Sequence, residues 1–142
     1  MPKLQTYYRG LSEVEQDKLT ISMDTQNIYH LDVDWLETKE YTTTSEFLVD
    51  KFLEKCPYYK STTKALGKHL FFRLDKKLTK KKQLIKESVS CDLYEDLEIL
   101  SGCMGWCPSS GTVIQSDLPI PTFTKSELPF GLRQDIKDFQ IC

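Results

Sequence analysis

Two aspartates separated by one residue follow a short apolar run early in the chain. The run covers residues 28–31, and Asp32 and Asp34 come directly after it. Such a run predicts a β-strand, whose side chains alternate between the two faces of a sheet. We therefore expect both carboxylates on one face, where each raises the pKa of the other. Mg²⁺ or Mn²⁺ relieves that repulsion and prefers oxygen ligands, so the pair predicts a divalent metal site.

The pair also has a plainer interpretation, because acidic residues at strand ends often form turns in solvent. His30 shares the face of Asp32 and Asp34 if the strand alternates strictly. It either lies beside the metal or is simply packed in the protein, and we favour packing.

Two more predicted strands carry polar side chains. Lys68–Leu74 places His69 and Arg73 on the face opposite its leucines, and Leu93–Ser101 places Asp96 and Glu98 on one face. Nucleotidyl transfer requires carboxylates that hold metals, and a donor or cation that steadies the triphosphate. The three strands together supply these groups.

The remaining elements must position these strands. Over residues 21–34 we expect a turn followed by the first strand. A helix is then expected to begin at the capping box of Thr43 and Glu46. That helix has one apolar stripe and ends at Pro57. The stripe consists of Val49, Phe52, Leu53 and Cys56.

After the helix we expect a short strand at Tyr58–Lys60, a polar turn over residues 61–67, and an exposed helix or loop over residues 75–88. A short strand is expected at residues 112–114. The motifs thus occupy residues 21–114, and residues 115–142 form a linker and a C-terminal helix with Leu132, Ile136 and Phe139 on one side. The sum is one domain of the α+β or α/β class over residues 1–142, with a mainly antiparallel or mixed sheet and covering helices.

The charge is unevenly distributed. The net charge is −2, yet residues 60–86 hold ten basic residues and one acid, Asp75. A basic segment in an acidic protein is either a solvated face or a contact for nucleotide or nucleic acid. The candidate nucleic-acid contacts are Lys76, Lys77, Lys80, Lys81 and Lys82.

The five cysteines show no disulfide framework, and free intracellular thiols are the expectation. The alternative to free thiols is a zinc site. Cys103 and Cys107 would supply half of its ligands, and Cys91, Cys56 or His69 would complete it. No apolar run reaches the roughly 18 residues of a membrane span, and the first residues lack a secretory signal. We expect a protein of the cytoplasm or nucleus that does not bind a membrane.

Three motifs in this order resemble the archaeo-eukaryotic primase superfamily. Residues 31–34 (Leu-Asp-Val-Asp) match its first motif, residues 67–69 (Gly-Lys-His) its second, and Leu97-Glu98 its third. Residues 98–106 loosely resemble a stretch that follows the third acid in the primase-polymerase domains of large eukaryotic DNA viruses and related mobile elements. The resemblance spans roughly residues 21–114.

The resemblance implies an RRM-like catalytic core and a metal-dependent DNA primase or polymerase that acts in DNA replication. Asp32, Asp34 and Glu98 would be catalytic and would hold Mg²⁺ or Mn²⁺, with Asp96 as the rival for the third carboxylate. The implied partners are a DNA template, nucleoside triphosphates and a helicase domain or subunit. The resemblance also implies a viral or mobile-element origin. The residues implied to bind nucleotide are His69, Lys68, Arg73 and Ser61.

Two other functions stay open. One is an inactive nucleic-acid-binding relative that keeps the fold and the lysines. The other is a phosphatase similar to the haloacid dehalogenases, in which Asp32 is the nucleophile and Asp34 the acid or base. Leu36 fits that second pattern poorly.

Overall fold

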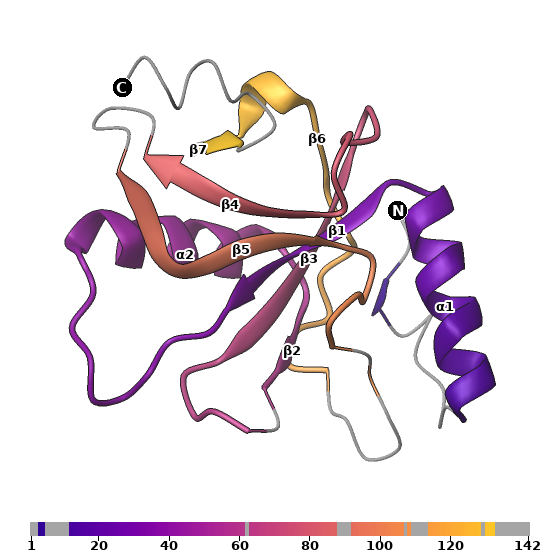
Figure 1. Cartoon of the computed structure of the whole chain (residues 1–142), viewed down its shortest axis with the longest axis horizontal. Coiled ribbons are helices and arrows are strands. Elements are labelled where there is room, and N and C mark those ends of the chain that lie inside the picture. Colours follow the sequence, from indigo (N-terminus) through magenta and orange to yellow (C-terminus); the bar gives the residue numbers. More distant parts are fainter. Residues whose placement is uncertain are drawn as a thin grey trace.

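The structure is a computed structural model that describes residues 3, 4, 12–61, 63–87, 92–106, 108, 114–128 and 130–132. These residues form an α+β arrangement of one sheet and two α-helices. The sheet has the strand order β2-β3-β1-β5-β4-β7, and all neighbours along this path are antiparallel. The short β6 pairs in parallel with β3. Figure 1 shows β1 running through the middle of the sheet.

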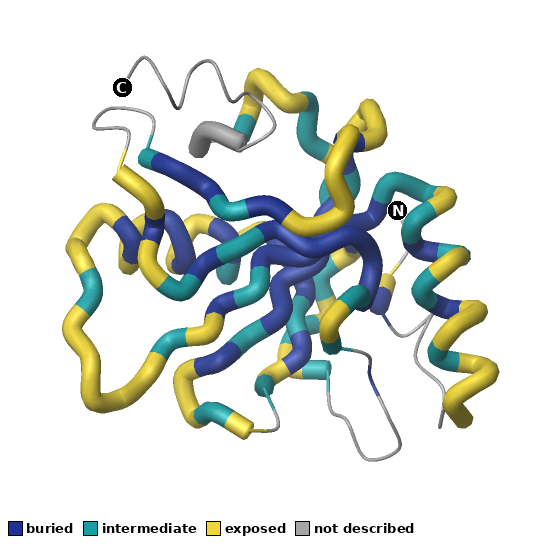
Figure 2. The backbone as a smooth tube through the Cα atoms, in the orientation of Figure 1, coloured by how far each residue is buried: buried dark blue, intermediate teal, exposed yellow. Residues whose placement is uncertain are grey.

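The strands are short, and the central ones are almost wholly buried, as the dark blue tube in Figure 2 shows. Their bounds are β1 (Ile28–Val33), β2 (Tyr58–Lys60), β3 (Lys68–Leu74), β4 (Lys82–Glu87), β5 (Leu93–Ser101), β6 (Thr122–Phe123) and β7 (Phe130–Leu132). The predicted strands at 58–60, 68–74 and 93–101 are confirmed.

The helices cover opposite faces of the sheet. On one face, Leu48, Val49 and Phe52 of α2 (Thr43–Lys55) pack against Leu31 and Phe72. On the other, Leu19 and Met23 of α1 (Glu13–Thr25) join a second apolar cluster with residues of β1, β2 and β3. The side chains of one strand alternate between these two clusters. The sheet is therefore the middle layer of the molecule.

The predicted helix after the acidic pair is confirmed, with its cap one residue earlier than expected. The Thr42 hydroxyl accepts a hydrogen bond from the Ser45 backbone N–H at 3.1 Å, so Thr42 is the N-cap rather than Thr43. Helix α2 ends at Lys55, before Pro57. A short 3₁₀ turn, η2 (Lys125–Glu127), follows β6.

Two predictions of local structure are wrong. Residues 21–25 belong to α1 and not to a turn, and only Leu19 and Met23 of this helix are buried, so its apolar periodicity is weak. Residues 82–87 form β4, although Lys82 and Lys86 suggested an exposed segment. Pairing with β5 and β7 on both sides buries β4 despite its polar composition.

The stretch predicted to be a linker contributes β6 and β7 to the sheet. Leu132 ends β7, while Ile136 and Phe139 of the predicted final helix lie outside the described residues. Of the strand expected at 112–114, only Ile114 is described, as an isolated bridge to Tyr59. Neither α1 nor α2, each of 13 residues, is long and apolar enough to cross a membrane, and the described residues include no other α-helix.

Candidate functional site

The three motifs meet on one row across the centre of the sheet. Asp32 of β1 lies directly opposite His69 of β3 on one side and Glu98 of β5 on the other. Residues directly opposite in antiparallel strands point to the same face, with Cβ atoms about 4.5–5.5 Å apart. The side chains of Asp32, His69 and Glu98 therefore stand side by side, on the face of the sheet that also carries α1.

Asp32 and His69 form the closest pair of the row. The Nδ1 atom of His69 lies 3.2 Å from Oδ1 of Asp32, an ion-pair distance without the angle of a good hydrogen bond. The His69 side chain is 7% exposed and that of Asp32 is 18% exposed. Burial raises the pKa of the Asp32 carboxyl, but His69, His30 and Lys64 outweigh it, so this pKa lies below its ordinary value.

His30 lies one step back along β1 on the same face and is completely buried. Its Nδ1 is 2.6 Å from the carbonyl oxygen of Gly102. A carbonyl only accepts, so Nδ1 carries the proton of the neutral ring and Nε2 keeps its lone pair. Burial and the neighbouring His69 lower the pKa of His30 to about 4, which leaves the ring neutral at neutral pH.

Glu98 occupies the other side of Asp32. Burial raises the pKa of Glu98, and the charges of Asp32 and Asp34 add to that rise against the opposite effect of Lys82. The Lys82 ammonium is 3.9 Å from Oε2 of Glu98 and is mostly exposed. Glu98 thus lies in a field of negative charge that a bound cation would relieve.

Asp34 leaves the sheet at the end of β1. Its carboxylate accepts a hydrogen bond of 2.7 Å from the ammonium of Lys64, and its side chain is 56% exposed. The contact with Asp34 raises the pKa of Lys64. Asp32 and Asp34 are thus two residues apart in sequence but have different partners.

Asp96, the rival for the third carboxylate, points elsewhere. Its backbone has a φ of 55°, in the left-handed region that few residues other than glycine adopt, which interrupts the alternation of β5. The hydroxyl of Tyr41 donates to Oδ2 of Asp96 at 2.8 Å, and the ammonium of Lys39 lies at 3.2 Å. These contacts lower the pKa of Asp96. Glu98, and not Asp96, stands opposite Asp32.

The other residues expected to bind nucleotide do not gather around His69. Lys68 alternates to the opposite face, where its ammonium donates to the Leu66 carbonyl at 3.3 Å and burial lowers its pKa. Arg73 is four residues along β3, and its Nε donates to the Gln26 carbonyl at 3.1 Å. Ser61 begins the loop that carries Lys64, and its hydroxyl accepts from the Lys64 backbone N–H at 3.2 Å.

The lysine-rich segment forms the β3–β4 connection and the start of β4. Lys77 and Lys81 lie 2.9 and 3.9 Å from Oδ2 of Asp24 on α1. Lys76, Lys80 and Lys82 are exposed. Lys82 alone of the five approaches a carboxylate of the row.

Trp106 closes one side of the row. Its ring stacks on that of His69, with centroids 4.1 Å apart and an interplanar angle of 11°, and Tyr59 packs against the same indole. This contact gives Trp106 a structural role. It also fixes the orientation of the His69 ring.

The side chains suited to a metal ion are not the expected three carboxylates. Ligand atoms of His30, Asp32 and His69 all lie within 4.8 Å of one another. In the described part of the chain, no other group of three histidine, cysteine or acidic side chains converges in this way. Asp34 and Glu98 therefore need side-chain movement before they share an ion with Asp32.

The cysteines stay outside this group. Cys103 is buried with its sulfur 3.1 Å from the Thr20 hydroxyl, and burial raises the pKa of the Cys56 thiol to about 12. Cys91 and Cys107 lie outside the described residues.

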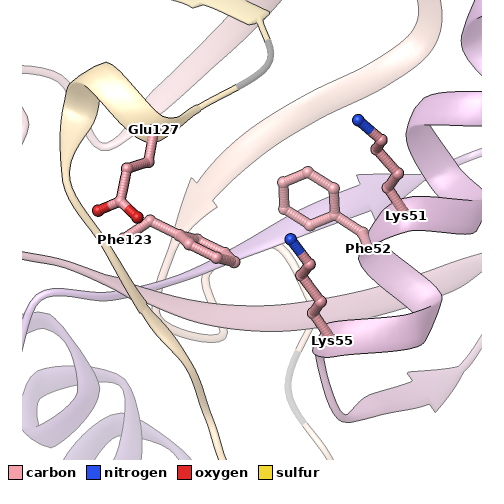
Figure 3. Close-up of a pocket in the computed structure, with 5 residues that line it drawn as sticks. All are labelled: Lys51, Phe52, Lys55, Phe123 and Glu127. Carbon is pink, nitrogen blue, oxygen red and sulfur yellow. The ribbon is translucent and has the colours of Figure 1, made fainter.

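Two hollows of the surface lie on the other side of the sheet from this row. One of them, of about 80 Å³, lies between α2 and the β6 segment. In Figure 3, Phe52 and Lys55 of α2 lie across from Phe123. A more open hollow of about 620 Å³ extends from Trp35 to Lys68. Neither is lined by His69, Asp32 or Glu98.

Comparison with known proteins identifies no relative: no family model, no curated protein and no solved structure matches this chain.

Two residues of the site were not predicted as such. His30 was favoured as a packed residue, although strict alternation along β1 already placed it beside Asp32. For Lys64, the signal in the sequence is its place in the polar turn before β3, the strand that pairs with β1. The orientation of the Lys64 side chain, which lies in a turn, could not be predicted from sequence spacing alone.

Proposed function

We propose that this chain is a metal-dependent nucleotidyltransferase of the primase-polymerase type, which adds nucleotides to a DNA strand under the direction of a template. The observation that supports the proposal most is the single row of Asp32, His69 and Glu98 across β3, β1 and β5. Three motifs that lie far apart in the sequence, in an order typical of primases, occupy neighbouring positions on one face.

The row provides the groups that the reaction needs. Asp32 and Glu98 would hold Mg²⁺ or Mn²⁺, and Asp34 would join them once its carboxylate leaves Lys64. The ion would align the attacking hydroxyl and the leaving pyrophosphate. His69 would contact the triphosphate, and its ring is held by Trp106.

The exposed lysines suit the template. Lys76 and Lys80 lie on the connection that leads into β4, whose first residue, Lys82, is near Glu98. Ammonium groups bind the nucleic-acid backbone without regard to sequence. A template that lies along this connection would pass beside the row.

The test is incorporation of labelled deoxynucleotides and ribonucleotides on a primed and an unprimed DNA template, with Mg²⁺ or Mn²⁺. Asp32→Asn and Glu98→Gln remove one charge each with little change of shape. Each variant is expected to lose at least about 100-fold in rate, equivalent to about 2.7 kcal/mol of barrier. Glu54→Gln, an exposed site on α2, is the matched control and should keep full activity.

Retained incorporation in folded Asp32→Asn would contradict the proposal. So would the absence of incorporation by folded wild type with both metals and both nucleotide types.

One observation favours a second candidate, an inactive relative that binds nucleic acid. The ammonium of Lys64 holds Asp34 at 2.7 Å, where an active site needs that carboxylate for a metal. This candidate predicts single-stranded DNA binding that Asp32→Asn leaves unchanged. Replacing both Lys76 and Lys80 with alanine should reduce the slope of log affinity against log salt by about 1.4, while Lys18→Ala on α1 should not.

Hydrolysis of a simple phosphate ester without template would instead support the phosphatase alternative.

A further inference from the structure

We infer that His30, Asp32 and His69 bind a divalent transition-metal ion of the Mn²⁺ to Zn²⁺ series through two imidazoles and one carboxylate. This site goes beyond the proposed nucleotidyl transfer, because His30 has no part in that reaction and the ion is bound without nucleotide. It shares only Asp32 and His69 with the proposed catalytic row.

The first support is the buried, unpartnered nitrogen of His30. The side chain is wholly buried, and Nε2 has no hydrogen-bond partner among the described residues. An unsatisfied polar atom inside a protein has lost its hydrogen bonds to water without gaining any in return, and this destabilises the fold. A metal ion at Nε2 relieves this destabilisation.

The second support is the bond on the opposite side of the same ring. Nδ1 of His30 donates to the Gly102 carbonyl at 2.6 Å. Histidines that ligate metals through one nitrogen usually donate the other N–H to a carbonyl or carboxylate, which fixes the tautomer. Gly102 has a φ of 54°, and an added Cβ would lie 3.0 Å from Cβ of Met23, so the turn that presents this carbonyl favours glycine.

The third support is the distance between the other two ligands. Nδ1 of His69 lies 3.2 Å from Oδ1 of Asp32. Two ligands that are each about 2.1 Å from one ion have that separation when the angle between them is roughly 100°, between octahedral and tetrahedral values. His69 is also buried, and neither of its ring nitrogens has a hydrogen bond of good geometry to a described residue.

The donor set determines the class of ion. Mg²⁺ prefers oxygen ligands, while imidazole suits the later first-row metals, so two histidines favour Mn²⁺, Co²⁺ or Zn²⁺ over Mg²⁺. The His30 and His69 rings lie edge to face, with centroids 5.2 Å apart, and need to shift only slightly to reach one ion. The partly exposed Asp32 carboxylate provides the route from solvent.

The chain contains only two histidines, so an untagged protein gives a selective readout. The experiment is titration of the untagged full chain with Co²⁺, followed by the proton resonances of both imidazoles and by the cobalt absorption spectrum. We expect one Co²⁺ per chain, paramagnetic shifts of both histidines, displacement by Zn²⁺ and no displacement by a 100-fold excess of Mg²⁺. A thiolate-to-cobalt absorption band would instead locate the ion at cysteine and overturn the inference.

His30→Asn is the decisive variant, because the asparagine amide can still donate to the Gly102 carbonyl while the Nε2 ligand is lost. Affinity for Co²⁺ should fall at least about 100-fold. Substituting a residue that only hydrogen-bonds to a metal ligand usually lowers affinity by less than this. His69→Phe keeps the stack on Trp106 and should lose binding similarly. Unchanged affinity in either variant, with folding checked by circular dichroism, would overturn the inference.

Glu98→Gln separates this inference from the proposed function. It should keep Co²⁺ binding and lose nucleotide incorporation. Cobalt binding without incorporation in wild type would contradict the proposed function alone, and incorporation without cobalt binding would contradict this site alone.

Discussion

Two aspartates two residues apart have different surroundings in this protein. Asp32 is held in the row beside His69 with its side chain 18% exposed, whereas Asp34 is 56% exposed and bound to Lys64. The strand ends between them, so the alternation that predicted a shared face applies only to Asp32. Alternation along regular strands was sufficient to predict the face on which Asp32 and His69 lie, because both residues are inside such strands.

The sequence could not distinguish Asp96 from Glu98, since both were expected on one face of one strand. The positive φ of Asp96 rotates it out of the row toward Tyr41. Such a backbone conformation is rare for a residue other than glycine, and no local sequence signal predicts it.

Gly67 supports the loop that carries Lys64. A Cβ at this position would lie 2.6 Å from Cβ of Ser61 and 3.3 Å from the Val33 carbonyl, both near backbone that cannot easily move. Gly67→Ala should therefore lower the free energy of unfolding by about 1–3 kcal/mol. Urea denaturation measures the change.

Ser61→Gly is the matched partner variant. Adding it to Gly67→Ala removes the closest clash and should recover part of the loss in a double-mutant cycle. Strictly additive effects of the two substitutions would contradict this account of the loop.

At the scale of elements, the central strands and the edge strand β2 were predictable, whereas β4, β6 and β7 were not. β3 and β5 have apolar residues at alternate positions, which is the pattern of a buried strand. β4 has mostly polar residues, and its place depends on hydrogen bonds to β5, the next strand along the chain, and to β7, which is distant in the sequence. Helix α1 was missed because it buries only Leu19 and Met23.

The N-cap of α2 gives a test at this scale. The Thr42 hydroxyl accepts the Ser45 N–H at 3.1 Å, so Thr42→Ala leaves this donor without its partner. We expect a loss of about 1 kcal/mol in the free energy of unfolding. Thr44→Ala, at an exposed position in the first turn, is the control and should cost little or slightly stabilise the helix.

Thermal and urea unfolding of the two variants give the comparison. Equal stabilities of Thr42→Ala and Thr44→Ala would show that the helix does not begin where the structure places it.

At the scale of the whole molecule, the sheet separates two apolar clusters, one under α2 and one under α1. Asp24 at the end of α1 ties that layer to the rest. It accepts a hydrogen bond of 2.6 Å from the Ser101 hydroxyl on β5 and one of 2.9 Å from Lys77 in the β3–β4 connection. These contacts hold the pKa of Asp24 below its ordinary value of 3.8.

Asp24 therefore makes stability depend on pH. A carboxyl whose folded pKa is lowered stabilises the fold above its unfolded pKa, and this contribution is lost as the pH falls through the folded value. Asp24→Asn should be less stable than wild type at neutral pH, and the difference should shrink below pH 3.8. Chemical denaturation at a series of pH values measures it.

Asp17→Asn, at an exposed position on the same helix, is the control and should follow the wild-type pH dependence. A constant difference between wild type and Asp24→Asn across the acidic range would contradict the role assigned to Asp24.

The most direct test of the central claim is calorimetric titration of the chain with a nucleoside triphosphate, with and without Mn²⁺, for wild type, Asp32→Ala and the exposed control Asp75→Ala. The proposed function predicts binding that requires the metal, persists in Asp75→Ala and is lost in Asp32→Ala. Absence of metal-dependent binding in folded wild type, or equal binding in Asp32→Ala, would contradict the claim that this row is a nucleotidyl-transfer site.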